Sequence, residues 1–153
     1  MRATNYIGQK ELNLATNYFD YRAGLGNVGS YQASSKPYLS SSIILNSDNT
    51  VIELKFPNIS RFITVKNTGP DASDEAQFRV GFSENGVNGL EYDNYLTLNN
   101  QESFSADYRV KAIYLRVHPS GGSTNATASV IAGLTAIAAG ELGHNWSGSD
   151  GVG

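Results

Sequence analysis

The sequence contains no cysteine and few charged residues, and both absences narrow the classes of protein to which it can belong. Without cysteine there can be no disulfide framework, thiolate metal site or cysteine nucleophile. Charged residues make up 16% of the 153 residues, against roughly 25% in an ordinary soluble domain. The net charge is −3 and no basic cluster occurs, so the positive stripe of a nucleic-acid binder is missing. We therefore expect no nucleic acid as a direct partner.

Long apolar runs are missing as well. The first residues contain no continuous hydrophobic stretch of the kind found in signal peptides. The longest apolar-leaning segment, residues 126–142, is interrupted by Ser, Thr and Gly and is too short to span a bilayer. We therefore expect a protein made in the cytoplasm, without a membrane partner, and long enough to form one domain with its own core.

The residues that are present favour β-structure. Residues 50–56 (TVIELKF) alternate apolar and polar side chains, which is the period of a half-buried strand. The turn residues 46–49 separate this run from residues 42–45 and predict a hairpin. Further runs that favour strands lie at residues 61–67, 78–82, 95–98, 103–108, 110–118 and 126–137. The sequence therefore predicts an all-β fold, a single antiparallel β-sandwich of about eight strands with jelly-roll or other Greek-key connections.

Composition divides the chain into three zones. Residues 1–42 are polar and aromatic without periodicity and predict an extended N-terminal arm; residues 43–137 form the sandwich; residues 138–153 predict a flexible C-terminal tail. Tyrosine gives a large contact area at small entropic cost and keeps a hydroxyl for hydrogen bonding, so aromatic residues in such arms indicate partner binding. The predicted contact residues are Tyr18, Phe19, Tyr21, Tyr31, Tyr38 and Trp146.

Residues 24–29 read GLGNVG, the GxGxxG spacing of a dinucleotide-binding turn. That turn binds pyrophosphate only between a buried parallel strand and the N-terminus of a helix. Here Asp20 and Arg22 interrupt the residues before it, and Pro37 and many serines follow it, which disfavours a crossover helix. We therefore expect no cofactor, and interpret the glycines as a joint within the arm.

The sequence offers little for catalysis or metal binding. Its two histidines, His118 and His144, lie near a strand end and in the glycine-rich tail, and no nucleophile motif accompanies them. The acidic residues of two loops, residues 71–75 and 84–93, are oxygen ligands that suit calcium. Neither loop has the spacing of an EF-hand, so calcium stays open as an alternative. We expect no catalytic residues, no enzyme activity and no metal site.

A small, weakly charged sandwich with aromatic ends resembles the auxiliary proteins of virus capsids, which are the decoration (cement) proteins of tailed phages and the minor capsid proteins of large icosahedral viruses. The runs RFITVKNTG, QFRVGF, NYLTLNNQESFSADYRVKAIYLRV and NATASVIAGLT carry this resemblance and cover roughly residues 60–135. It implies a non-enzymatic virion subunit that binds the major capsid protein or other shell subunits. It also implies a homo-oligomer, with a trimer favoured, located in the virion.

A second hypothesis stays beside the first. Exposed aromatic residues together with loop acids are also typical of a carbohydrate- or receptor-binding module, such as a domain of a viral spike or fibre. The aromatic candidates for this role are Tyr92, Tyr95 and Tyr114.

Overall fold

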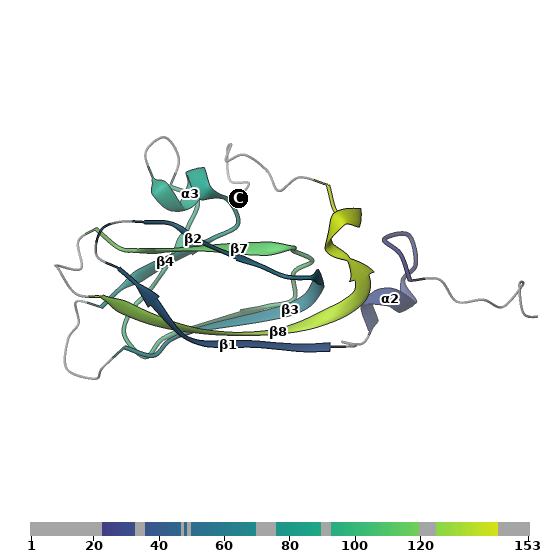
Figure 1. Ribbon diagram of the computed structural model, residues 1–153, viewed down its shortest axis with the longest axis horizontal. Coiled ribbons are helices and arrows are strands. Elements are labelled where there is room, and N and C mark those ends of the chain that lie inside the picture. Colours follow the sequence, from purple (N-terminus) through teal and green to yellow (C-terminus); the bar gives the residue numbers. More distant parts are fainter. Residues whose placement is uncertain are drawn as a thin grey trace, which may run out of the picture.

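The fold is a sandwich of two antiparallel four-stranded sheets, as Figure 1 shows for the computed structural model of the chain. The all-β sandwich predicted from the sequence is confirmed. The structure describes residues 23–32, 36–46, 48, 50–69, 76–89, 93–119 and 125–143. No helix within these ranges is long and apolar enough to cross a membrane.

We call the two sheets sheet I and sheet II. Sheet I has the strand order β1-β8-β3-β6 and sheet II the order β2-β7-β4-β5. The strands of sheet I are β1 (Lys36–Leu45), β8 (Ala126–Ala138), β3 (Asn58–Asn67) and β6 (Ser103–Ala106). The strands of sheet II are β2 (Ile52–Lys55), β7 (Ala112–Val117), β4 (Phe78–Gly81) and β5 (Leu96–Leu98). Two short helices, α2 (Gly29–Gln32) and α3 (Glu84–Asn88), and a 3-10 turn η1 (Ala139–Glu141) complete the described elements.

The pairing of strands defines the topology. β1 pairs with β8, β2 with β7, β3 with β6 and β4 with β5, all antiparallel. The first four strands therefore lie against the last four in reverse order, like a long ribbon folded back on itself. Further pairs between β3 and β8 and between β4 and β7 join this ribbon into two sheets. This is the strand order of a jelly roll, one of the arrangements left open by the sequence.

The core lies between the two sheets, because alternate side chains of each strand point inward. In β7 and β8 the inward positions are almost completely buried. Aromatic packing reaches the end of the core, where the rings of Tyr38 and Phe56 meet edge to face at 5.0 Å. The largest fully buried side chains include Phe78, Leu45, Ile63, Ile113, Leu115 and Leu134.

Two expectations about the start of the sandwich are wrong. Residues 42–45 and 50–56 do not form a hairpin, because β1 pairs with β8 in sheet I whereas β2 pairs with β7 in sheet II. The boundary at residue 42 is also wrong, because β1 begins at Lys36 and pairs with β8 from that residue onward. Residues 36–42 therefore belong to the sheet and not to an arm.

One polar side chain, that of Asn67, connects the ends of several strands inside the molecule. It is fully buried at the end of β3. Its Nδ2 donates to the carbonyls of Ala76 and Leu98 at 2.6 and 3.2 Å, and its Oδ1 accepts from the Gly69 backbone N–H at 3.0 Å. Asn67 thus bonds three backbone groups, one of them in β5, and ties the end of β3 in sheet I to sheet II.

Candidate functional site

The predicted contact residues fall into two groups. Tyr18, Phe19, Tyr21 and Trp146 lie outside the described residues. Tyr38 belongs to β1, where it packs against the core and against Phe56. The arm position predicted for Tyr38 is therefore wrong, because its side chain serves the sandwich.

The glycine-bearing segment before β1 forms a closed turn. The backbone N–H of Gly24 donates to Ser30 Oγ at 3.1 Å, and the Asn27 side chain accepts from the Gly29 N–H. The hydroxyl of Tyr31 donates to the Leu25 carbonyl. The guanidinium of Arg109, from the segment after β6, lies 4.5 Å from the centre of the Tyr31 ring. Tyr31 therefore holds this turn against the sandwich.

This turn lacks the context of a dinucleotide site. α2 has only four residues, and the strand after it, β1, pairs antiparallel. All strand pairs among the described residues are antiparallel, whereas a pyrophosphate site of this kind needs a parallel strand followed by a crossover helix. Neither Gly24 nor Gly26 has a positive φ, and both leave open space where a Cβ would lie.

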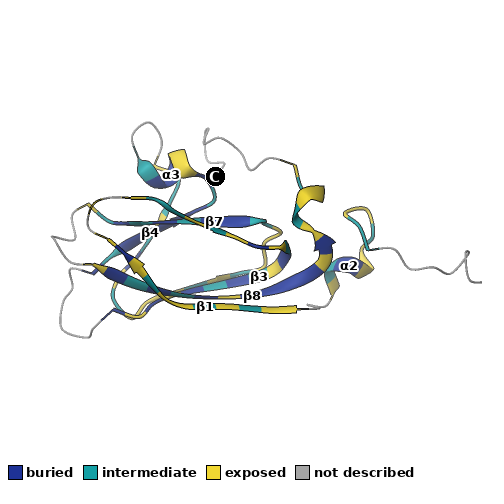
Figure 2. Cartoon of the chain, in the orientation of Figure 1, coloured by how far each residue is buried: buried dark blue, intermediate teal, exposed yellow. Residues whose placement is uncertain are grey.

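The outer face of sheet I carries exposed apolar side chains. Leu39 of β1 and Ile131 of β8 face each other across the strand pair and are 68% and 47% exposed. Ile44, further along β1, is 59% exposed. The outward neighbours around them, such as the hydrogen-bonded Thr64 and Ser105, bear hydroxyl groups. Figure 2 shows exposed positions along β1 in yellow. Isolated apolar residues are normal on surfaces, but a paired row on one sheet face is typical of an interaction site.

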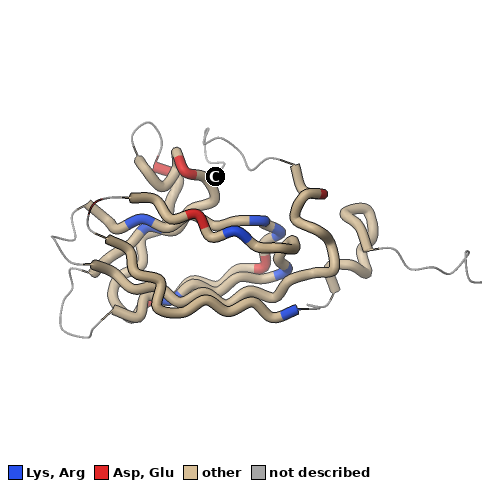
Figure 3. The backbone as a smooth tube through the Cα atoms, viewed as in Figure 1, with Lys and Arg blue, Asp and Glu red and all other residues tan. Residues whose placement is uncertain are grey.

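The charges of sheet I are of one sign. Its four strands contain no Asp or Glu, although the whole chain has a net charge of −3. The cations are Lys36, Arg61 and Lys66, all exposed (Figure 3). The apolar and hydroxyl side chains of this surface lose little hydration energy when a partner covers them, whereas the three cations need acidic groups on the partner. We call this surface the sheet I face.

The opposite face of the sandwich is partly covered by α3. The helix starts at Ser83, whose side chain accepts from the Gly86 N–H, and ends at Gly89 with φ 63°. Arg79 of β4 is 7% exposed, and its Nη1 donates to the Val87 and Asn88 carbonyls. Arg116, its cross-strand partner on β7, also donates to Asn88. The two arginines therefore cap the last carbonyls of α3 and hold it on sheet II.

Aromatic rings and a histidine surround this arginine pair. The Arg79 guanidinium lies 4.0 Å from the centre of the Tyr95 ring, which in turn meets His118 at 6.2 Å. Burial and the charge of Arg79 lower the pKa of both Arg116 and His118. This shift favours the uncharged form of His118. The arrangement stabilises α3, so we assign it a structural role.

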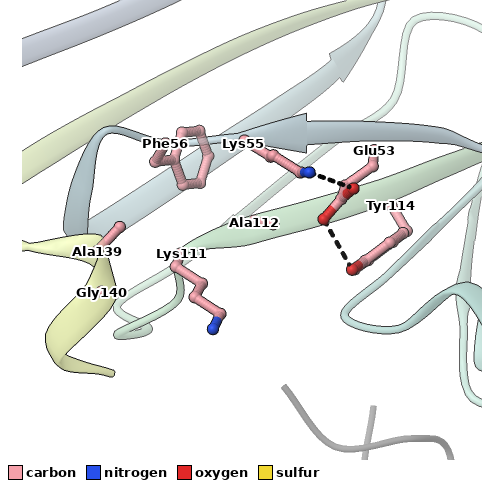
Figure 4. A pocket seen from close by; sticks show the side chains of 8 residues that line it. All are labelled: Glu53, Lys55, Phe56, Lys111, Ala112, Tyr114, Ala139 and Gly140. Carbon is pink, nitrogen blue, oxygen red and sulfur yellow. Dashed lines mark hydrogen bonds and ion pairs between the residues drawn. The ribbon is translucent and has the colours of Figure 1, made fainter. Parts of the chain in front are cut away.

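A groove lies where β2, the start of β7 and η1 meet. It has a volume of about 310 Å³, and its lining residues are Glu53, Lys55, Phe56, Lys111, Ala112, Tyr114, Ala139 and Gly140. Figure 4 shows the Glu53 carboxylate between its two partners. Glu53 Oε1 accepts from the Tyr114 hydroxyl at 3.0 Å and Oε2 lies 3.1 Å from Lys55 Nζ. Lys111 Nζ donates to the Leu142 carbonyl at 3.3 Å.

The phenol of Tyr114 loses its proton less readily than a free tyrosine does. Burial, the hydrogen bond to Glu53 and the charges of Glu53 and Glu84 raise the pKa of Tyr114 to about 12. The phenol therefore stays protonated and keeps donating to Glu53 throughout the neutral range.

We expect Tyr114 to lose its proton only near pH 12, and the substitution Glu53→Gln to move this pKa toward 10. Since the neutral phenol is favoured in the folded state, its contribution to stability is complete below about pH 10 and is lost as the pH rises toward about 12. The tyrosinate absorbance of the wild type minus that of Tyr114→Phe measures the titration. A wild-type value near 10 would contradict the burial of this ring.

The described residues contain no group of three or more His, Asp or Glu side chains that could hold a metal ion. Of the acidic loops considered for calcium, residues 71–75 and Glu91 lie outside the described ranges. Glu84 lies on the exposed side of α3 and Asp93 follows it at an exposed position. The calcium alternative stays a prediction.

Comparison with known proteins adds no relative to this picture. Neither the protein-family models nor the curated proteins contain a match to the sequence. The class of protein is therefore defined by the fold, an all-β jelly-roll sandwich, and function has to be inferred from its surfaces.

Sequence reasoning identified neither surface as a site, although it named Tyr114 of the groove as an aromatic candidate for carbohydrate binding. The sheet I face combines residues from β1 and β8, which are about 90 positions apart in the chain, and alternation alone does not pair two strands. The groove likewise joins Glu53 to Lys111 and Tyr114. For α3 a signal was present, because Ser83 before Glu84 and Gly89 after Asn88 are typical helix boundaries.

Proposed function

We propose that the chain is a non-enzymatic structural subunit of a virus particle, a capsid decoration or minor capsid protein that binds neighbouring shell proteins. The sheet I face is the observation that carries this proposal. It presents the apolar pair Leu39 and Ile131 with exposed Ile44, and its strands contain no acidic residue. Such a face provides contact area without the cost of burying unpaired carboxylates.

The jelly-roll topology supports the proposal without deciding it. Capsid subunits use this fold, but lectin domains and cupins use it too. Capsid subunits differ from lectin domains and cupins in which part of the surface contacts the partner. A shell subunit needs a broad face toward its neighbour, and many weak copies of one contact stabilise the assembled state through multivalency.

The test is co-sedimentation of the purified chain with assembled shells of the candidate major capsid protein. We expect the double variant Leu39→Asp, Ile131→Asp to bind at least about 30-fold more weakly, because each change buries a charge at an apolar contact. Leu96→Asp is the matched control, because Leu96 is an equally exposed apolar residue at the edge of sheet II. Equal binding of both variants would show that the sheet I face is not the contact, and no binding by the wild type would overturn the proposal.

Deletion of residues 1–22 tests the predicted aromatic arm separately. The deletion removes none of the described elements, because all of them lie after residue 22 and β1 begins at Lys36. We expect an unchanged thermal midpoint, within about 2–4 °C, and weaker shell binding because Tyr18, Phe19 and Tyr21 are removed. Full binding after the deletion would overturn the arm hypothesis. The triple variant Tyr18→Ser, Phe19→Ser, Tyr21→Ser keeps the chain length. It is the control that separates the loss of these aromatic side chains from the shortening of the chain.

A further inference from the structure

We propose that the groove between β2, β7 and η1 binds a sugar unit that carries a carboxylate, such as a hexuronic acid. This proposal goes beyond the shell function and does not depend on it. It rests on three features of the groove: an apolar floor, a surplus of positive charge, and acceptors for hydroxyl groups.

The floor of the groove is apolar. Phe56 and Ala112 lie at its base but are only 3% and 2% exposed, so they fix the shape of the groove. The Tyr38 ring packs against Phe56 from the inside. The carbon surface open to a ligand belongs to the half-buried Tyr114 and Ala139. Such a surface suits the C–H face of a pyranose ring.

The polar rim of the groove carries one net positive charge. Lys55 and Lys111 each contribute one cation, and Glu53 contributes one anion. Lys55 is paired with Glu53, whereas the described partner of Lys111 is a neutral carbonyl, that of Leu142. An ammonium group has three donors, so Lys111 can also donate to a ligand. A monoanionic carboxylate matches this charge and forms a charge-assisted hydrogen bond.

Glu53 favours hydroxyl groups on the rest of the ligand. A carboxylate offers about four acceptor positions, and Glu53 uses one on each oxygen, for Tyr114 and Lys55. The remaining positions accept from hydroxyl groups. Glu53 repels any anion beside it, and a phosphate dianion more strongly than a single carboxylate, so the carboxylate of the ligand is placed at Lys111 and its hydroxyl groups at Glu53. The combination of a single carboxylate with neighbouring hydroxyls is the chemistry of a uronic acid.

The size of the groove sets the length of the ligand and its affinity. Its volume of about 310 Å³ lies at the lower end of the range of small-molecule sites, which is about 300–1,000 Å³. It therefore takes one sugar unit. A single unit bound in an open groove is expected to have a Kd on the order of 1 mM.

The experiment is an NMR titration of the isotope-labelled full chain with methyl glucuronide, methyl glucoside and acetate. We expect saturable shifts for the glucuronide at the amides of residues 53–56, 111–114 and 139–140, with about tenfold weaker binding of the other two probes. Absence of saturable shifts in the groove, or equal binding of the glucoside or of acetate, would overturn the proposal.

Two variants test whether Lys111 binds the carboxylate of the sugar. Lys111→Met is expected to reduce the preference for glucuronide over glucoside to about twofold or less. Lys66→Met removes the same charge from the exposed side of sheet I and should keep the full preference. If Lys111→Met is unfolded by circular dichroism, Lys55→Met replaces it, because the Lys55 side chain is 75% exposed. If a folded variant that lacks Lys111 or Lys55 keeps the full preference for glucuronide over glucoside, that lysine does not bind the carboxylate. If both of these variants keep the full preference, the proposal is overturned.

Discussion

Replacing Asn67 with leucine is expected to destabilise the protein by about 3–5 kcal/mol, because three buried backbone groups lose their partner. The Asn67 side chain is fully buried and serves the carbonyls of Ala76 and Leu98 and the N–H of Gly69. Leucine has the same branched shape and the same number of side-chain heavy atoms, but its methyl groups cannot satisfy these backbone groups and are bulkier than the amide they replace. The carbonyls and the N–H would then stay buried without hydrogen bonds, or the segments that carry them would have to separate.

Urea unfolding monitored by fluorescence measures this loss as a lower midpoint at an unchanged slope. Asn99→Leu is the matched control, because Asn99 is exposed in the turn between β5 and β6. We expect this control to change the free energy of unfolding by less than about 0.5 kcal/mol. A loss below about 1 kcal/mol for Asn67→Leu would contradict the connecting role of the asparagine.

Replacing Arg79 with methionine is expected to cost about 2–4 kcal/mol and to release α3 from sheet II. Arg79 is almost completely buried, and its Nη1 donates to two carbonyls at the end of the helix. Hydrogen bonds from a charged donor contribute about 1.5–3 kcal/mol. The contact with the Tyr95 ring at 4.0 Å adds up to about 2 kcal/mol where the cation is desolvated.

Arg116→Met should cost less than Arg79→Met, although Arg116 also donates to Asn88. Arg116 donates to this single carbonyl, whereas Arg79 donates to two carbonyls and also contacts the Tyr95 ring. Arg61→Met, at an exposed position of β3, is the control and should be nearly neutral. Hydrogen exchange at the amides of Val87 and Gly89, which bond to Ser83 and Asn85, reports on α3 directly. Equal protection in Arg79→Met and in the wild type would contradict the capping role.

Alternation of apolar and polar residues predicted most of the strands, because the inward face of each strand has to be apolar. Ile52 and Leu54, for example, pack against the core while Glu53 and Lys55 are exposed. The same pattern contains no information about which strand supplies the hydrogen bonds. The turn residues 46–49 suggested a hairpin, but the chain there passes from sheet I to sheet II.

The start of β1 was missed for a different physical reason. Its first part contains Pro37 and the serines of residues 40–42, which are residues of loops in most contexts. β1 pairs only with β8, at one edge of sheet I, and an edge strand tolerates a proline because one side of its backbone needs no ladder partner. The register shift between Ser40 and Ile43, with Ser42 at φ 57°, accommodates the serines.

The order of strands in sheet I also determines when the protein can fold during synthesis. β8 lies between β1 and β3 and pairs with both. A nascent chain that has released β1 to β7 from the ribosome therefore still lacks the strand that joins the two halves of this sheet. Its apolar faces stay uncovered until residue 138 has emerged, because no earlier strand substitutes for β8. Formation of the native sheet therefore has to wait for β8, and its many long-range pairings make folding slow compared with that of helical domains of similar size.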